Sequence, residues 1–177
     1  MIEVTNLFKR FDDLEVLKGI SAEFKQGDTS LIIGASGSGK TVFLKCLLGL
    51  LEPDGGDITY DGRPYSKMEK DDKRNLRKEM GMVFQSGALF DSETIENNIM
   101  FPLKMFTNQS REEIHERENY VLARVHVENA HNKFPAELSG GMQKRVAIAR
   151  AIVMNPKYLF CDEPNSGLDP KTAIVID

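Results

Sequence analysis

Hydrophobic and polar residues alternate in short runs along the first sixty positions, and residues that favour turns separate these runs. Residues 2–5 alternate, and residues 16–24 form a second strand-like run. Residues 26–28 predict a turn. Residues 30–33, with the apolar run Leu31-Ile32-Ile33, then lead as a strand into a glycine-rich segment. The period of two predicts an N-terminal part built from β-strands.

Helix and strand patterns alternate in the residues that follow. Residues 40–50 are apolar almost all round, which predicts a deeply buried helix, and the Pro-Asp-Gly-Gly sequence at 53–56 ends it. Residues 57–62 predict a short strand that ends in a turn. The strongly charged residues 68–78 predict another helix, and residues 81–85 a strand.

The region from 86 to 155 is rich in helix formers, which predicts a helical lobe inserted into an α/β core. A capping box at 110–113 begins one of its helices. Ser139 precedes a helix whose apolar stripe contains Met142, Val146, Ala149 and Val153. The apolar residues 158–161 then predict a parallel strand covered on both faces. This order predicts an α/β open sheet with its ligand at the carboxyl ends of the strands.

Composition and charge narrow the functional classes. The 177 residues carry a net charge of −4, which argues against nucleic-acid binding as the main role. Cys46 and Cys161 lie in apolar segments and are interpreted as buried hydrophobic residues in a reducing compartment. The three histidines (His115, His126 and His131) lack a zinc-type spacing and are interpreted as residues of a solvated helix face. With no signal peptide or long apolar segment, we expect a cytoplasmic protein that reaches a membrane only through a partner.

The strongest chemical signal is a phosphate-binding loop at residues 34–41, Gly-Ala-Ser-Gly-Ser-Gly-Lys-Thr. In this G-x-x-x-x-G-K-[ST] spacing, glycines let backbone N–H groups approach phosphate oxygens, and the following helix directs its positive dipole end at the same anion. We expect Lys40 to reach the β- and γ-phosphates and Thr41 to bind Mg²⁺. The loop residues expected to bind the nucleotide are Gly34, Ser36, Gly37, Ser38, Gly39, Lys40 and Thr41.

Two adjacent carboxylates follow the strand at 158–161. Asp162, at the end of a buried strand, is the candidate Mg²⁺ ligand. Glu163 is the candidate general base that orients and deprotonates the attacking water. The alternative is two solvated acids at the end of a strand.

A second anion site is predicted where Ser139, Gly140 and Gly141 begin a helix, since hydroxyl, backbone N–H groups and helix dipole converge there. The alternative is a serine cap with a flexible glycine pair. One chain rarely needs two triphosphate sites, so we expect the second to serve the nucleotide of a neighbouring copy. The predicted active form is therefore a head-to-tail dimer.

With these motifs in order, the chain resembles the nucleotide-binding domain of ABC transporters over essentially its whole length. Residues 34–41 match the Walker A loop, residues 138–143 the signature motif and residues 158–162 the Walker B strand. The resemblance implies ATP and Mg²⁺ as ligands and a phosphate-loop (RecA-like) core with a parallel sheet, an antiparallel N-terminal β part and an inserted helical lobe. It predicts one domain over 1–177, with an ATP-binding core of 1–85 and 156–177 and a helical lobe of 86–155.

The resemblance also implies roles for single residues. Glu163 corresponds to the catalytic glutamate, and Gln85 to the glutamine that contacts Mg²⁺ and water and links the two lobes. Gln143 belongs to the signature motif, and Asp169 lies in the D-loop at the dimer interface. Phe11 falls where the family has an aromatic ring that stacks on adenine, although it can equally be a core aromatic at the end of a strand.

One departure concerns the family's switch histidine, which lies beyond the D-loop and has no counterpart among the three histidines here. The sequence is interpreted as a fragment or a truncated product. We expect it to bind ATP and Mg²⁺ but hydrolyse ATP poorly, because removing a comparable transition-state donor costs about 10²–10³ in rate. We also expect reduced stability, since missing strands leave apolar core surface uncovered.

The expected partners are a second nucleotide-binding subunit and an integral membrane permease, with no nucleic acid. Residues 84–92 resemble the corresponding stretch of MCE/Mla-type ATPases, which implies phospholipid as cargo; another cargo is the alternative. Methionine and phenylalanine side chains in 99–106 can form a permease groove or fill the helical lobe's own core. A catalytically weak regulatory module and a non-transport ABC protein are the competing functions.

Overall fold

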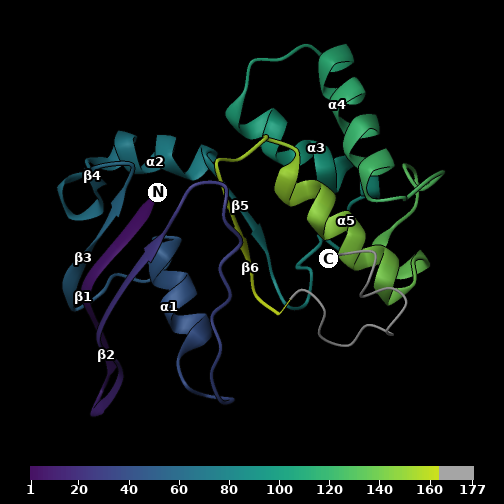
Figure 1. Cartoon of the computed structure of the whole chain (residues 1–177). Coiled ribbons are helices and arrows are strands. Elements are labelled where there is room, and N and C mark those ends of the chain that lie inside the picture. The colour runs from purple at the N-terminus through teal and green to yellow at the C-terminus, as the bar shows by residue number, and fades with distance from the viewer. Residues whose placement is uncertain (164–177) are drawn as a thin grey trace. The chain divides into compact units, whose positions relative to one another are not determined.

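The chain folds as two compact units, residues 1–77 and residues 78–177 (Figure 1). The computed structural model describes residues 1–163. The fold is mixed α/β, as predicted, with an antiparallel sheet in the first unit and a parallel strand pair with helices in the second. No helix within residues 1–163 combines the length and the apolar character needed to cross a bilayer.

The first unit is built on a four-stranded antiparallel sheet with strand order β2-β1-β3-β4. The central strand β1 pairs with both long neighbours, so that Ile2 lies opposite Phe24 on one side and Tyr60 on the other. The strands predicted at residues 2–5, 16–24 and 57–62 are confirmed. The bounds of the strands in this sheet are Ile2–Phe11 for β1, Leu14–Phe24 for β2, Gly55–Tyr60 for β3 and Arg63–Pro64 for β4.

The helix α1 (Lys40–Leu47) packs in the core of this unit. The rings of Phe43 and Phe24 lie 6.3 Å apart between centroids, and the Tyr60 hydroxyl donates to the carbonyl of Leu47. Alternate strand residues complete the core because successive strand side chains point to opposite faces. The remaining helical elements of the unit are the short 3₁₀ turn η1 (Tyr65–Lys67) and the predicted charged helix α2 (Lys70–Lys78). The last residue of α2, Lys78, lies one position beyond the end of the unit.

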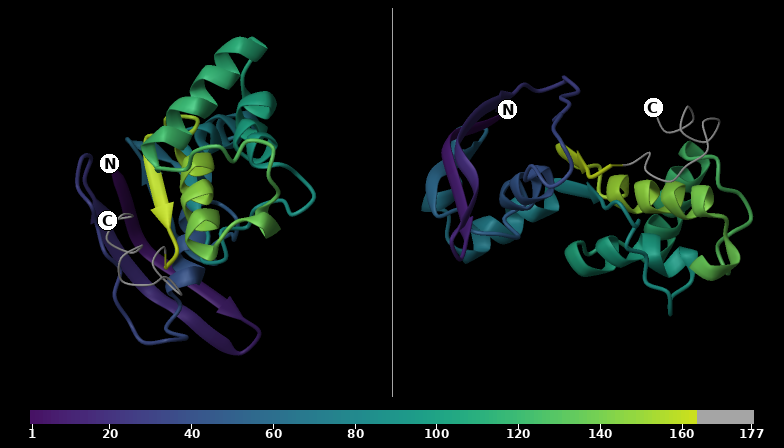
Figure 2. Two further views of the ribbon diagram at one scale, coloured as in Figure 1. Left: turned by 90° about the vertical axis from the view of Figure 1, so that its right-hand side faces the viewer. Right: turned by 90° about the horizontal axis from the view of Figure 1, so that it is seen from below.

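The second unit contains two parallel strands, β5 (Met80–Val83) and β6 (Tyr158–Cys161), paired in register from Met80↔Tyr158 to Val83↔Cys161. The helix α5 (Gly140–Ile152) packs beside this pair, as Figure 2 shows. Parallel pairing aligns the carboxyl ends of both strands at the same edge.

Three helices and a 3₁₀ turn form the predicted helical region of the second unit (Figure 2). Their bounds are Ile95–Phe106 for α3, Arg111–Arg124 for α4, Pro135–Glu137 for η2 and Gly140–Ile152 for α5. The capping box of α4 is confirmed, because Ser110 Oγ accepts from the Glu113 N–H and the Glu113 carboxylate accepts from the Ser110 N–H. The residues buried between the helices are Ile95, Ile99, Met100, Leu103, Ile114, Val121, Leu122, Val125, Val127, Ala130, Leu138, Val146, Ala149 and Val153.

Three predictions about this framework are wrong. Residues 30–33 belong to no sheet, and Leu31 and Ile33 are 81% and 85% exposed, since no strand within residues 1–163 pairs with them. Cys161 is exposed, whereas Cys46 is buried as expected. The strand β6 is not covered on both faces, because Leu159 as well as Cys161 is exposed. An apolar run predicts a strand but not the neighbours that cover it.

Candidate functional site

The phosphate loop lies in the first unit, immediately before α1. Gly39 is the N-cap of α1 and adopts the left-handed conformation with φ of 95°. A Cβ at this position would come within 2.8 Å of Cγ1 of Val16 on β2. The turn into the helix therefore requires glycine for both conformation and space. The predicted loop residues Gly34, Ser36, Gly37 and Ser38 all lie in this turn segment.

Lys40 folds its side chain back over the loop. Its Nζ donates to the carbonyl oxygens of Gly34 at 2.9 Å and Ala35 at 3.0 Å. This geometry holds the ammonium beside the loop backbone, where an anion bound by the loop would offer it a charged acceptor and a stronger hydrogen bond. Thr41 is the next helical residue and is exposed at the start of α1.

Phe11, the predicted adenine-stacking residue, ends β1 and pairs with Leu14 across the β1–β2 turn. It is 42% exposed, which argues against the alternative that it is a core aromatic. The Lys9 ammonium lies 5.6 Å from the ring centroid, which adds a positive charge next to the exposed ring. The stacking role itself stays a prediction.

In the second unit, Gln85 and Glu163 meet just beyond the carboxyl ends of β5 and β6. The Nε2 of Gln85 donates to Oε2 of Glu163 at 2.9 Å. Glu163 adopts a left-handed backbone with φ of 49°, an unfavourable conformation for a residue with a side chain. Between them, the Asp162 N–H donates to the Val83 carbonyl at 2.9 Å, which continues the ladder by one residue.

These contacts bring together two of the three residues predicted for Mg²⁺ and catalysis at this edge, and Asp162 directly precedes Glu163. Carboxylate, amide and hydroxyl oxygens, as in Asp162, Gln85 and Thr41, are the hard ligands that Mg²⁺ prefers. The donor chemistry of the predicted metal set thus fits the ion. When bound, Mg²⁺ would neutralise charge on the nucleotide phosphates.

The predicted second anion site is the beginning of α5. Ser139 is the N-cap, and its Oγ accepts from the Met142 N–H at 3.3 Å. A Cβ added to Gly140 would meet no atom of the described residues within 4 Å, so the helix end has open space beside it. Gly141 follows as the second helical residue.

Gln143 has a structural contact that sequence reasoning missed. Its Nε2 donates to the carbonyl oxygens of Pro135 at 2.9 Å and Leu138 at 3.3 Å. These bonds fix the turn that leads into α5 and hence the position of Ser139. A nucleotide contact by Gln143 stays a prediction, and Asp169 lies outside the described residues.

Sequence reasoning also missed the residues that fix the segment after Gln85. Asn98 is fully buried on α3; its Oδ1 accepts from the Phe90 N–H at 2.7 Å and its Nδ2 donates to the carbonyls of Phe90, Glu93 and Thr94. Arg150 on α5 donates to the Gly87 carbonyl at 2.8 Å. Burial lowers the pKa of Arg150. A polar residue inside an apolar helical stretch was the available signal for Asn98.

The chain is therefore a phosphate-loop domain with a carboxylate pair after a parallel strand and a glycine-rich helix start. It matches the ABC transporter family over residues 17–166, and it belongs to that family.

Curated relatives carry several different names. The chain is 41% identical to the "Probable ribonucleotide transport ATP-binding protein mkl" of Mycobacterium tuberculosis over 96% of its length and 47% of that protein. It is 42% identical to the "Methionine import ATP-binding protein MetN" of Clostridium tetani, over 97% of the chain and 54% of the relative. It is 38% identical to the chloroplastic "Protein TRIGALACTOSYLDIACYLGLYCEROL 3" of Arabidopsis thaliana, over 100% of the chain and 53% of the relative. The chain spans about half the length of the curated relatives it matches.

Solved cassettes share the fold. The dimeric structure of MJ0796, described as a bacterial ABC transporter cassette, superposes with a TM-score of 0.92 at 33% identity, over 99% of this chain and 79% of that one. A dimeric post-hydrolysis state of MJ0796 bound to ADP and Pi gives a TM-score of 0.90 at 32% identity, with the same coverage.

Proposed function

We propose that this chain binds ATP with Mg²⁺ and hydrolyses it, as the ATP-binding subunit that powers transport by a membrane permease. The observation that carries the proposal is the Gln85–Glu163 hydrogen bond directly after Asp162. It joins a carboxylate, which can accept a proton from water, to an amide that can help to hold that water, and this chemistry supports Glu163 as the general base. The Lys40 ammonium beside the phosphate loop supports the same activity.

The test of nucleotide binding uses Lys40→Ala with Lys45→Ala as the matched control. Both lysines lie on α1, and Lys45 is exposed in its last turn, away from the loop. We expect Lys40→Ala to weaken ATP binding and abolish turnover, while Lys45→Ala behaves as wild type. Equal ATP affinity in the two variants, measured by a fluorescent ATP analogue and competition, would contradict the proposal.

The active form in this proposal is a head-to-tail dimer in which the α5 helix end of one copy contacts the nucleotide of the other. The open space beside Gly140 and the dimeric MJ0796 cassettes support it. Gly140→Leu should leave the monomer folded, because no described atom lies within reach of a new Cβ. It should abolish ATP-dependent dimerisation in a Glu163→Gln background, as measured by sedimentation velocity. Undiminished dimerisation would exclude this arrangement.

The proposed cargo is a phospholipid, supported by the sequence of residues 84–92. The name of the Arabidopsis relative contains that of a glycolipid built on diacylglycerol, which supports a lipid cargo in general. The names of the mkl and MetN relatives favour a ribonucleotide or methionine instead. These cargo classes can be distinguished by copurifying the chain with its permease, reconstituting the complex into vesicles and measuring ATP turnover with each candidate cargo. Stimulation of ATP turnover by phospholipid, and not by methionine or ribonucleotides, is the expected result.

The proposed docking surface for the permease consists of the exposed part of α3 and the segment before it that contains Phe90. Phe90, Phe101 and Met105 are exposed, and the first two rings contact each other edge to face with centroids 5.0 Å apart. Met100, in contrast, is buried in the helical core. Cross-linking should therefore occur from Phe101 but not from Met100. The proposed location is cytoplasmic, with membrane contact through the permease alone.

A further inference from the structure

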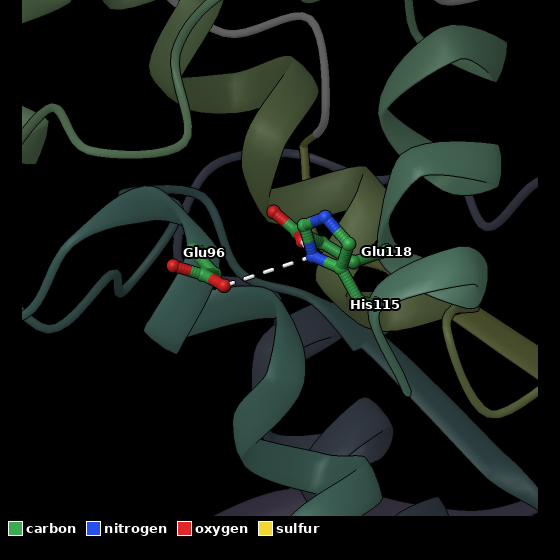
Figure 3. A group of neighbouring side chains, drawn as sticks. All are labelled: Glu96, His115 and Glu118. Carbon is green, nitrogen blue, oxygen red and sulfur yellow. Dashed lines mark ion pairs between the residues drawn. The ribbon is translucent and has the colours of Figure 1, made fainter. Parts of the chain in front are cut away.

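Two acidic and two histidine side chains from separate elements converge on the helical region of the second unit. Glu96 lies in the first turn of α3, and His115 and Glu118 lie one turn apart on α4. His131 lies in the connection between α4 and η2. Figure 3 shows Glu96, His115 and Glu118 directed toward one another. None of the four belongs to a nucleotide motif. His115 is an exposed residue of α4, as expected for a solvated helix face, whereas that interpretation is wrong for His131, which lies outside the helices.

The distances within this group are short. The Nδ1 of His115 lies 3.1 Å from Oε2 of Glu118 and 3.7 Å from Oε1 of Glu96. One ligand atom from each of the three residues can be chosen so that all lie within 4.8 Å of one another. Bonds of about 2.0–2.2 Å to a shared metal ion place neighbouring ligand atoms roughly 3.0–3.5 Å apart. The group is therefore close to the size of a metal coordination shell.

Glu118 is the buried member, with a side-chain exposure of 0%. Its Oε1 lies 2.7 Å from His131 Nδ1, a hydrogen-bonding distance. Its Oε2 is buried and has no hydrogen-bond partner among residues 1–163, although it lies beside His115 Nδ1. A buried carboxylate oxygen without a partner is costly, because it has lost its hydration without replacement. Glu118 Oε2 thus directs an unsatisfied negative group into the space shared with His115 and Glu96.

Acceptors outnumber donors at this point. The Nδ1 of His115 can carry one proton, yet carboxylate oxygens of both Glu96 and Glu118 approach it. A divalent cation satisfies several such acceptors at once, whereas a single proton cannot.

The backbone holds the group in place. The Glu96 N–H donates to the His131 carbonyl at 3.0 Å, and the Ile95 N–H donates to the Lys133 carbonyl at 2.8 Å. The beginning of α3 is thereby attached to the loop that carries His131. His115 is 52% exposed, so the group can be reached from solvent while Glu118 forms its buried floor.

We propose that Glu96, His115 and Glu118 bind a first-row divalent metal ion of the Zn²⁺ class, and that His131 positions Glu118. One imidazole and two carboxylates form a mixed nitrogen and oxygen set that suits Zn²⁺, and water completes the shell. The contact between His131 and the ligand carboxylate is the outer hydrogen bond typical of metal sites. The ion joins α3 to α4 and is separate from the Mg²⁺ that accompanies the nucleotide.

The experiment titrates the untagged, metal-free full chain with Zn²⁺ against a chromophoric chelator, with nucleotide absent and Mg²⁺ in excess. We expect one equivalent to bind. At a free Zn²⁺ concentration of about a hundred times Kd, the Tm of the protein should rise by roughly 5–10 °C. Co²⁺ provides the spectroscopic signature, as visible d–d absorption bands from a protein site with nitrogen and oxygen ligands.

His115→Ala and Glu118→Gln remove ligands, and His126→Ala and Glu116→Gln are their matched controls on exposed positions. We expect the ligand variants to lose the Co²⁺ bands and the Tm shift, and His131→Ala to weaken binding about 10–100-fold. Because His115 is half exposed, the His115→Ala variant should have the same Tm as wild type when a chelator keeps both free of metal. This variant therefore tests the proposal even if Glu118→Gln fails to fold. No stoichiometric binding, or equal binding by wild type and His115→Ala, would overturn the proposal while leaving the ATPase assignment intact.

Discussion

The side-chain amide of Gln85 donates to the carboxylate of Glu163 across 2.9 Å, although the two residues lie 78 positions apart in the chain. Parallel pairing of β5 with β6 brings them together, because Val83 and Cys161 pair at the end of the ladder and each functional residue follows two positions later. The left-handed backbone at Glu163 turns the chain at this point. The contact fixes the carboxylate that we propose as the general base.

Replacing Glu163 with glutamine is predicted to reduce ATP turnover by about 10²–10⁴, the range expected when a general base is removed. Gln85 Nε2 can still donate to the new amide oxygen, so ATP affinity and stability should stay near wild type. Steady-state phosphate release and nucleotide binding measure the two effects. Glu116→Gln, on the exposed face of α4, is the control. A Glu163→Gln variant that turns over ATP at the wild-type rate would remove Glu163 from the mechanism.

Replacing Gly39 with alanine is predicted to destabilise the first unit and abolish nucleotide binding. The variant must place a Cβ at φ of 95° and within 2.8 Å of Val16. Gly27→Ala is the matched control, because Gly27 has a similar φ of 84° and open space around it. Urea unfolding should show a loss of about 1–2 kcal/mol for Gly27→Ala, the conformational cost alone, and a larger one for Gly39→Ala. Equal losses would mean that the Val16 contact relaxes without cost.

Local spacing in the sequence predicted the structural elements around the candidate site well. The phosphate loop, the Ser110 and Ser139 caps and the apolar stripe of α5 all follow from residues within one or two turns. Exposure was harder to predict, as residues 30–33 and Cys161 show, because it depends on which distant elements pair with a strand. Gln85 was assigned from family resemblance, and only the register of β5 on β6 shows its contact with Glu163.

The polar interior of the helical region could not be predicted for the same reason. Glu118 is a single acidic position on an amphipathic helix in the sequence, yet the fold buries it completely beside two histidines. Asn98 likewise makes four hydrogen bonds to the backbone of residues 90–94 only when the segment that contains Phe90 returns to α3.

Replacing Asn98 with alanine is predicted to lower the free energy of unfolding by about 2–4 kcal/mol. The change removes the fully buried Asn98 side chain and leaves the backbone N–H of Phe90 and three carbonyl groups of residues 90–94 without their side-chain partner in a partly buried setting. Asn97→Ala is the neighbouring control; its side chain bonds to Glu93 and Lys104 in an exposed setting and should cost below about 1 kcal/mol. Similar unfolding free energies for the two variants would contradict the anchoring role of Asn98.

The capping box at Ser110 predicts a pH dependence of stability with a definite sign. Hydrogen bonds from the Ser110 N–H and hydroxyl hold the pKa of Glu113 below its ordinary value. A carboxyl group whose pKa is lower in the folded state stabilises the protein above its unfolded pKa. That stabilisation is lost as the pH falls through the folded pKa.

Glu113→Gln should therefore reduce stability at pH 7 and leave it unchanged in strong acid, where the wild-type carboxyl group is protonated as well. Unfolding free energies from urea titrations between pH 2 and pH 7 measure this difference directly. Glu112→Gln, also in the first turn of α4 but outside the capping box, is the control and should show a smaller dependence. Because the Glu113 carboxylate accepts from the Ser110 N–H at 2.7 Å, a flat difference across this range would mean that the hydrogen bond makes no net contribution in solution.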